Sequence, residues 1–308
     1  MIVVLTGGTG GAKLIEGLAA EMDPAELTII CNTGDDAIFH GLYVSPDVDT
    51  IIYTLAGLSD SEKGWGIRGD TFTALEQLRR LGNDAWFNLG DKDLATHITR
   101  TKLLNEGSKL SEVTERLCRQ LGVRSRILPM SDQRVETRVQ TPQGELSFQE
   151  FFVKERWKRE VTSVRLVGVE QAQPAPGLLD AIHSAEAIVI CPSNPITSIG
   201  PILAVPGIRA ALEQANAPVV GVSPLIGGAA ISGPAHKLMV ALGFEASAVG
   251  VAKCYKEFLD TLLIASDDGA SAPQVEAFGI APVSTDIRMA TLVDKRRLAR
   301  EVLALVKK

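Results

Sequence analysis

The sequence predicts a Rossmann-like α/β protein, with three layers (α/β/α) around a mostly parallel sheet. Short apolar runs alternate along the chain with helical patterns, beginning with Ile-Val-Val-Leu at residues 2–5. Such runs are typical of strands that are buried on both faces of a parallel sheet. Aromatic residues make up only 5% of the chain. This composition, together with abundant Ala, Val, Ile, Leu and Gly, favours α/β layering over a β-sandwich.

The chain of 308 residues, 45% of them apolar, is long enough to bury a large core, and we interpret residues 1–308 as a single domain. A run of helical patterns interrupts the alternation, which predicts a helical insertion over about 50–122. Its helices are expected at about 71–82, 93–106 and 111–121. A Pro-Gln-Gly turn between two short runs predicts a β-hairpin over about 134–148.

The other strands follow from apolar runs that end in turn residues. After the first strand, we expect strands at 27–32, 125–130, 164–169, 187–190, 218–222, 262–266 and 280–283. We assign the runs from 164 onward to the parallel sheet, and residues 294–307 to a closing amphipathic helix.

Composition excludes several classes of function. The formal net charge is −6 with no long basic run, which argues against nucleic acid as a partner. The four cysteines lie far apart, as expected for reduced thiols of a cytoplasmic protein. We see neither a signal peptide nor an apolar run near the roughly 20 residues that span a membrane.

A glycine-rich loop at residues 6–13 reads Thr-Gly-Gly-Thr-Gly-Gly-Ala-Lys and lies between a strand and a helix. This arrangement points backbone N–H groups at an anion, and glycines let a phosphate approach closely. The loop matches neither the dinucleotide fingerprint nor the P-loop. We expect Gly8, Thr9, Gly10, Gly11 and Lys13 to bind a phosphate. The alternative is a turn that only lets the strand pack on its helix.

An acidic turn follows the second strand, where Asn32 precedes Asp35 and Asp36. Because parallel strands end at one edge of the sheet, this turn should lie beside the glycine loop. Carboxylates beside a phosphate site would repel the ligand unless a cation lay between them. An ordinary Gly-Asp turn is the alternative.

Three further segments carry candidate functional residues. In residues 46–50, Asp47 or Asp49 is suited to cap the helix that follows. Residues 90–97 read Gly-Asp-Lys-Asp-Leu-Ala-Thr-His, which is densely charged for a simple cap. Residues 191–201 follow a strand and contain Ser193 and Asn194 in a turn rich in proline. At the start of a helix, this turn is a second candidate anion site.

Together, these motifs resemble the 2-phospho-L-lactate transferase (CofD) family of coenzyme F420 biosynthesis, and the resemblance runs nearly from end to end. Such enzymes use a guanosine diphosphate ester of a three-carbon acid as donor and the deazaflavin Fo as acceptor. They move the phosphoacyl unit to the terminal ribityl hydroxyl of Fo, release GMP and require Mg²⁺. The resemblance also suggests a homodimer.

The resemblance implies roles for individual residues. It places Asp49, Lys92 and Asp91 at the Fo site, and Asp35 and Asp49 at the metal and in catalysis. Our own candidates for the donor are the glycine loop with Lys13, joined by Asn32, Ser193 and Asn194. On this hypothesis Asp49→Asn leaves folding unchanged and lowers turnover by roughly two orders of magnitude.

Two other functions are kept as alternatives. A nucleotide-sugar-binding regulatory protein, from a related branch outside F420 biosynthesis, would need no Fo site. An NAD-dependent dehydrogenase is disfavoured, because Lys13 replaces the third glycine and Asn32 replaces the acid at the strand tip. The sequence does not distinguish donors derived from phospholactate, phosphoenolpyruvate or phosphoglycerate.

Overall fold

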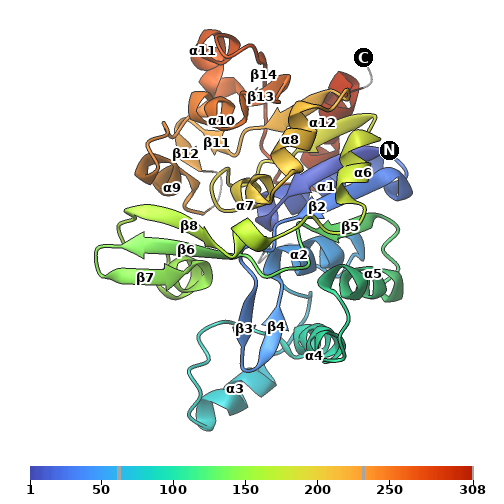
Figure 1. The fold of residues 1–308 in the computed structure, drawn as a ribbon, viewed down its shortest axis with the longest axis vertical. Coiled ribbons are helices and arrows are strands. Elements are labelled where there is room, and N and C mark those ends of the chain that lie inside the picture. Colours follow the sequence, from blue (N-terminus) through green and yellow to red (C-terminus); the bar gives the residue numbers. More distant parts are fainter. Residues whose placement is uncertain (61–63, 231–232, 307–308) are drawn as a thin grey trace.

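The computed structural model describes residues 1–60, 64–230 and 233–306, and a parallel β-sheet runs through its centre (Figure 1). Within these residues the sheet has seven strands, each parallel to its neighbours. Across the sheet they are β14 (Ala281–Thr285), β13 (Thr261–Ala265), β10 (Val219–Val222), β9 (Ala187–Ile190), β1 (Ile2–Thr6), β2 (Leu27–Cys31) and β5 (Arg126–Pro129).

The sheet is covered on both faces, because alternate strand residues enter two separate hydrophobic clusters. In β1, Val3 and Leu5 join one cluster, whereas Ile2 and Val4 join the other. The first cluster is completed by α6 (Leu178–His183), α7 (Ile199–Ala204), α8 (Ile208–Glu213), α9 (Ala235–Ala241), α10 (Ala248–Tyr255) and α11 (Ala272–Glu276). The second is completed mainly by α1 (Gly8–Glu21), α2 (Pro46–Leu55), α5 (Leu110–Gln120) and α12 (Leu292–Val306). The predicted three-layer α/β fold is confirmed.

Two groups of elements extend from this core (Figure 1). The first contains the antiparallel pair β3 (Ala37–Phe39) and β4 (Leu42–Val44), with α3 (Thr73–Arg80) and α4 (Asp91–Asn105). The second is an antiparallel sheet of β7 (Gly144–Ser147), β6 (Glu136–Thr141) and β8 (Ser163–Val167). Shorter elements are the 3₁₀ turns Pro24–Glu26, Val169–Gln171 and Ser266–Ser271, the π-helical turn Glu150–Lys154, and the strands β11 (Leu225–Ile226) and β12 (Ala229–Ala230).

Most predicted elements are confirmed, including the helices now seen as α3, α4 and α5 and the hairpin β6–β7. The assignment of residues 164–169 to the parallel sheet is wrong, because β8 pairs antiparallel with β6. Exposed Ser163, Arg165 and Val167 alternate there with half-buried neighbours, as in a strand with one solvated face. The closing helix is confirmed as far as Val306, and Lys307 lies outside the described residues.

The strand register places the candidate loops at one edge of the sheet. Thr6 pairs with Cys31, and Leu5 pairs with Ile190, so β1, β2 and β9 end nearly level. The glycine loop, the acidic turn and the turn after β9 therefore meet, as expected for an open α/β sheet. Among the described residues, no helix is long and apolar enough to cross a membrane.

Candidate functional site

A cavity of about 680 Å³ opens where these three loops meet. Its wall includes Gly8 from the glycine loop, Asp35 from the acidic turn and Ser193 from the turn after β9. A volume of this size is typical of a site for a substrate or cofactor. Of the predicted donor residues, Gly8, Thr9, Gly10, Lys13, Ser193 and Asn194 line it, whereas Gly11 and Asn32 do not.

The glycine loop forms the start of α1, and different physical constraints require glycine at its different positions. Gly8 has φ +71°, a conformation that L side chains rarely adopt. A Cβ at Gly10 would lie 2.5 Å from the carbonyl oxygen of Pro192, so packing against the neighbouring loop requires glycine there. This differs from the expectation that Gly10 mainly leaves space for a phosphate. Lys13 lines the cavity and has no hydrogen bond or ion pair within the described part of the chain.

The turn after β9 is tied to the glycine loop and to itself. The Gly7 N–H donates to Ser193 Oγ over 3.2 Å. Asn194 Oδ1 accepts from the Ile196 N–H over 2.9 Å, which closes a local turn. Ser193 thus holds the two loops together and Asn194 stabilises its own turn, and both residues also line the cavity.

Asn32 is fully buried and serves as a support. Its side-chain amide donates to Asp47 Oδ2 over 2.9 Å and to the Thr197 carbonyl over 3.2 Å, and its Oδ1 accepts from the Gly34 N–H over 2.8 Å. Asn32 therefore joins β2, α2 and the turn after β9 behind the cavity. Its predicted role in binding the donor becomes a positioning role.

Asp35, Asp36 and Asp47 form a buried acidic group. Burial, followed by the charges of Asp47 and Asp36, raises the pKa of Asp35 well above its ordinary value. Burial raises the pKa of Asp47 to about 6, although hydrogen bonds from Asn32 and the Gly8 N–H oppose the shift. Asp36 instead accepts a short hydrogen bond from the Ser45 hydroxyl and does not line the cavity.

Asp49 lies on α2 and forms a two-point contact with Arg100 of α4. The Arg100 Nη1 donates to Asp49 Oδ2 over 3.0 Å, and Nη2 makes a shorter contact with Oδ1. Arg100 is fully buried, and Asp49 is nearly so. Although burial opposes it, the Asp49 carboxylate raises the pKa of Arg100, so the guanidinium stays charged. Asp49 faces the cavity, but each of its oxygens already accepts from the guanidinium.

A chain of side chains continues from this pair. Arg100 Nη1 lies 3.3 Å from His97 Nδ1, and His97 Nε2 lies 3.1 Å from Asp93 Oδ1. Because a guanidinium only donates, Nδ1 accepts, which leaves the proton of a neutral imidazole on Nε2, facing Asp93. The Tyr53 hydroxyl also donates to Asp93 Oδ1, over 2.7 Å. Although burial raises the pKa of Asp93, these two neighbours bring it below its ordinary value.

Asp91 and Lys92 do not line the cavity. The Asp91 carboxylate accepts from the Thr71 hydroxyl and from the N–H groups of Thr73 and Ala74, and so caps the start of α3. Lys92 Nζ donates to the carbonyls of Arg68 and Gly69 over 3.3 and 3.1 Å. In this structure both side chains hold the insertion together, and their predicted contact with the acceptor stays a prediction.

Aromatic side chains form another part of the wall. Phe39 of β3 stacks on Phe87, with ring centroids 4.1 Å apart, and Trp86 meets both rings edge-on. On a different segment, Phe148, Phe152 and Trp157 form a ladder. Phe39 does not line the cavity, whereas the other five rings do. The cavity therefore joins an acidic and glycine-rich part to an aromatic part.

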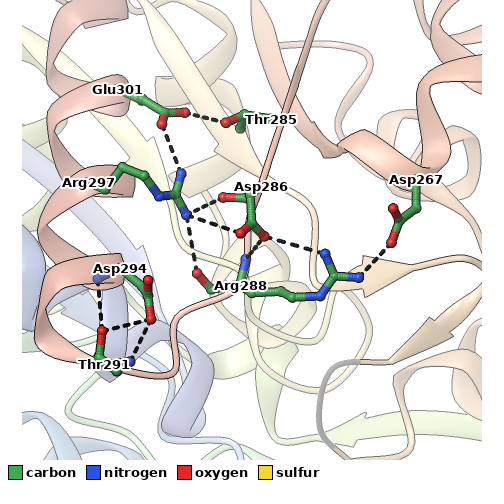
Figure 2. Close-up of polar contacts among 8 residues, drawn as sticks. All are labelled: Asp267, Thr285, Asp286, Arg288, Thr291, Asp294, Arg297 and Glu301. Atoms are coloured by element: carbon green, nitrogen blue, oxygen red, sulfur yellow. Dashed lines mark hydrogen bonds and ion pairs between the residues drawn. The ribbon is translucent and has the colours of Figure 1, made fainter.

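The segment after β14 brings Ile287 and Met289 to the cavity, and a polar network holds it from behind (Figure 2). Asp286 contacts Arg288 and Arg297, and Arg297 also reaches Glu301 of α12. Arg288 Nη2 lies 2.5 Å from Asp267 Oδ2, and Figure 2 shows the Arg288 side chain pointing toward Asp267. These contacts lie at the surface and fix the course of the segment. Its apolar side chains, Ile287 and Met289, are buried and lie on the cavity side.

The sequence interpretation missed Arg100, Tyr53 and Arg156 as site residues. A signal for Arg100 was present, because Asp93, His97 and Arg100 follow helical spacing and share one face of α4. Asp47 was considered only as a helix cap, although it lines the cavity beside Asp35. Arg156 stands in a run of charged residues of both signs, which in sequence indicates no site, but it lies in a turn at the cavity wall.

A magnesium ion was expected at Asp35 and Asp49. Among the described residues, no group of three or more His, Cys, Asp or Glu side chains is arranged to hold a metal. Magnesium, however, is commonly held by one or two carboxylates together with substrate phosphates and water. Asp35 Oδ1 is buried without a hydrogen-bond partner in this part of the chain, and Asp47 lies close enough to raise its pKa. Asp35 with Asp47 therefore fits such an ion better than Asp49.

Asp47 gives a pH-dependent stability that is measurable on the ligand-free protein. Its pKa of about 6 exceeds the ordinary value of 3.8, so the protonated form is favoured by folding. Its contribution to stability is complete below about 3.8 and is lost as the pH rises through about 6. The melting temperature of the wild type minus that of Asp47→Asn should therefore fall between pH 4.5 and 7. A flat or rising difference would contradict this assignment.

Comparisons with known proteins identify similar sequences and a similar fold. The family model described as 2-phospho-L-lactate transferase CofD matches residues 2–303. A phosphoenolpyruvate transferase from Streptomyces griseus is 47% identical over 310 residues, covering 99% of this chain and 98% of the relative. A 2-phospho-L-lactate transferase from Methanothermobacter thermautotrophicus is 44% identical over 303 residues, covering 98% and 97%. A crystal structure of a UPF0052 family member from Bacillus halodurans has a TM-score of 0.65 at 19% identity, covers 98% of both chains and shows a shared fold.

Proposed function

The chain belongs to the 2-phospho-L-lactate transferase CofD family and is a transferase, and from this premise we propose its reaction. It moves a three-carbon phosphoacyl unit from a guanosine diphosphate ester to the terminal ribityl hydroxyl of the deazaflavin Fo, and GMP leaves. The observation that carries the proposal is the composition of the cavity. Lys13, which is unpaired among the described residues, lies beside the glycine loop and suits a diphosphate, and the aromatic wall suits a flat ring system.

Asp49 is the residue proposed to act on the acceptor hydroxyl. A carboxylate has about four acceptor positions, and Arg100 occupies two, so Asp49 can still accept a hydrogen bond from an alcohol. Arg100 fixes the orientation of the carboxylate. Further contacts then run from Arg100 to His97, from His97 to Asp93, and from Asp93 to Tyr53. The hydroxyl is thereby held for attack on the phosphorus, and its proton is drawn toward Asp49.

The charge on the donor needs neutralising before an alcohol can attack it. Lys13 and the residues at the start of α1 line the cavity, and Lys13 is proposed to bind the diphosphate together with N–H groups of this loop. Asp35 and Asp47 are proposed to hold Mg²⁺, which would supply further positive charge to the phosphates. GMP then leaves with its own phosphate as the new bond forms.

The acyl unit is proposed to derive from phosphoenolpyruvate or 2-phospholactate, the two acids that the names of the relatives contain. A competition among guanosine donors made from these acids and from phosphoglycerate, with Fo and Mg²⁺, tests this by the masses of the products. One dominant product identifies the donor. If no donor yields product, the proposed reaction is wrong.

Titration with Fo alone separates the transferase from the regulatory alternative, because a nucleotide-sugar-binding protein needs no deazaflavin site. Fo fluorescence should change with saturation at micromolar concentrations, and absence of binding would favour the alternative. A cytoplasmic location and a homodimer are also proposed, and light scattering on the purified protein tests the dimer.

A further inference from the structure

The turn that follows Phe152 brings a guanidinium to the cavity, and no residue that the structure describes pairs with its charge. Within residues 1–60, 64–230 and 233–306, Arg156 makes no hydrogen bond or ion pair. Its neighbours differ, because Lys154 pairs with Asp84 and Arg159 pairs with Glu155. Lys13 is the other lysine or arginine among the residues that line the cavity. Arg156 is therefore an exposed cation at the wall that is unpaired within the described part of the chain.

The backbone at this position is unusual and firmly held. Arg156 and Trp157 have φ +50° and +46°, a region that residues other than glycine seldom occupy. The Trp157 N–H donates to the Phe151 carbonyl over 2.8 Å, and the Trp157 ring stacks on Phe152. Such conformations persist where the surroundings determine them, often at ligand-binding sites.

A lysine from another element fixes the same turn. Lys237 of α9 donates from Nζ to the carbonyls of Trp157, Lys158 and Arg159, at distances from 2.5 to 3.2 Å. One ammonium thus satisfies three consecutive carbonyls and holds the turn against α9. These contacts therefore hold the backbone of the turn, while the exposed Arg156 side chain has no partner among the residues that the structure describes.

We propose that Arg156 binds the carboxylate of the donor's three-carbon unit. This inference rests on the proposed function, in which the donor carries a carboxylate in addition to its diphosphate. The glycine loop and Lys13 already suit the diphosphate, so the carboxylate is the anion that remains for the second cation. The planar guanidinium matches a carboxylate at two points. Arg156 then holds the part of the donor that is transferred.

Two guanosine diphosphate esters that differ only in the carboxylate test this inference by calorimetry without Fo. One is the 2-lactyl ester, and the other is the isopropyl ester, which has similar shape and lacks the carboxylate. The wild type should bind the lactyl ester roughly 10- to 100-fold more tightly, the range of a charge-assisted hydrogen-bonded contact. Arg156→Gln should reduce this preference to about twofold, with unchanged affinity for the isopropyl ester.

Three further variants test whether the preference for the carboxylate depends on the position, the shape and the support of the Arg156 guanidinium. Lys158→Gln removes the same charge two residues away, outside the cavity wall, and should keep the full preference. Arg156→Lys should keep part of it, because lysine retains the charge without the planar fork. Lys237→Met should lower the preference while the protein remains folded, since it releases the turn that carries Arg156.

The outcomes are distinct. The inference is overturned if Arg156→Gln retains the preference of the wild type, if it weakens both esters equally, or if the wild type shows no preference. A wild-type protein that binds neither ester also contradicts the proposed function. A wild-type protein that binds both esters and acts on Fo, with Arg156→Gln behaving like it, contradicts only the role of Arg156.

Discussion

Asp49→Asn is expected to lower the free energy of unfolding by roughly 3–5 kcal/mol, the usual cost of breaking a buried ion pair. The buried Arg100 guanidinium would lose its anionic partner. Turnover should fall by roughly 100-fold or more, because the amide no longer draws the proton of the acceptor hydroxyl. The expectation from sequence that folding is unchanged is therefore revised. Chemical denaturation and single-turnover kinetics on one preparation measure both effects.

A double variant separates the two roles of Asp49. In Asp49→Asn with Arg100→Gln, neither buried charge is left alone, so much of the lost stability should return. Turnover should stay roughly 100-fold below that of the wild type, since the carboxylate is still absent. A double variant with nearly normal turnover would show that Asp49 only neutralises Arg100. In that case Asp49 has no part in the reaction.

The fold and the place of the site were predictable because they depend on local patterns. Alternating apolar and helical segments specify a parallel sheet, and parallel strands end at the same edge. Residues 6–13, the acidic turn and residues 191–201 were expected to meet, and side chains from each line one cavity. The misplaced strand at 164–169 shows the limit, because a short apolar run does not reveal its pairing partner.

The roles of individual charged residues were less accessible, because they depend on contacts between segments far apart in the chain. The prediction for Asp91 came from the resemblance alone, and the sequence did not show that its carboxylate accepts from three donors at the start of α3. In the sequence, Arg100 is one arginine in a helical pattern and indicates no special role. In the structure it is fully buried against Asp49, which lies 51 positions away in the chain. Sequence spacing describes one helix face, whereas burial and partners are properties of the assembled fold.

Asp35→Asn is the second variant with a large expected effect. Burial and the neighbouring acids raise the pKa of Asp35, so in the ligand-free protein its carboxyl resembles the neutral amide. The melting temperature without ligand should therefore change little. A metal ligand must be deprotonated, and an amide cannot supply that charge. Since metal charge is worth several kcal/mol in such reactions, turnover should fall by roughly 100-fold or more.

The pH dependence of Mg²⁺ binding distinguishes this role from a general loss of structure. With GDP present, wild-type affinity for Mg²⁺ should rise with pH, because the raised pKa of Asp35 makes the metal compete with a proton. Asp35→Asn should bind Mg²⁺ weakly, and the part of the pH dependence that arises from Asp35 should disappear. Asp36→Asn is the matched control, since Asp36 is similarly buried but accepts from Ser45 and does not line the cavity. If both variants lose Mg²⁺ equally, the effect is structural and Asp35 is not a ligand.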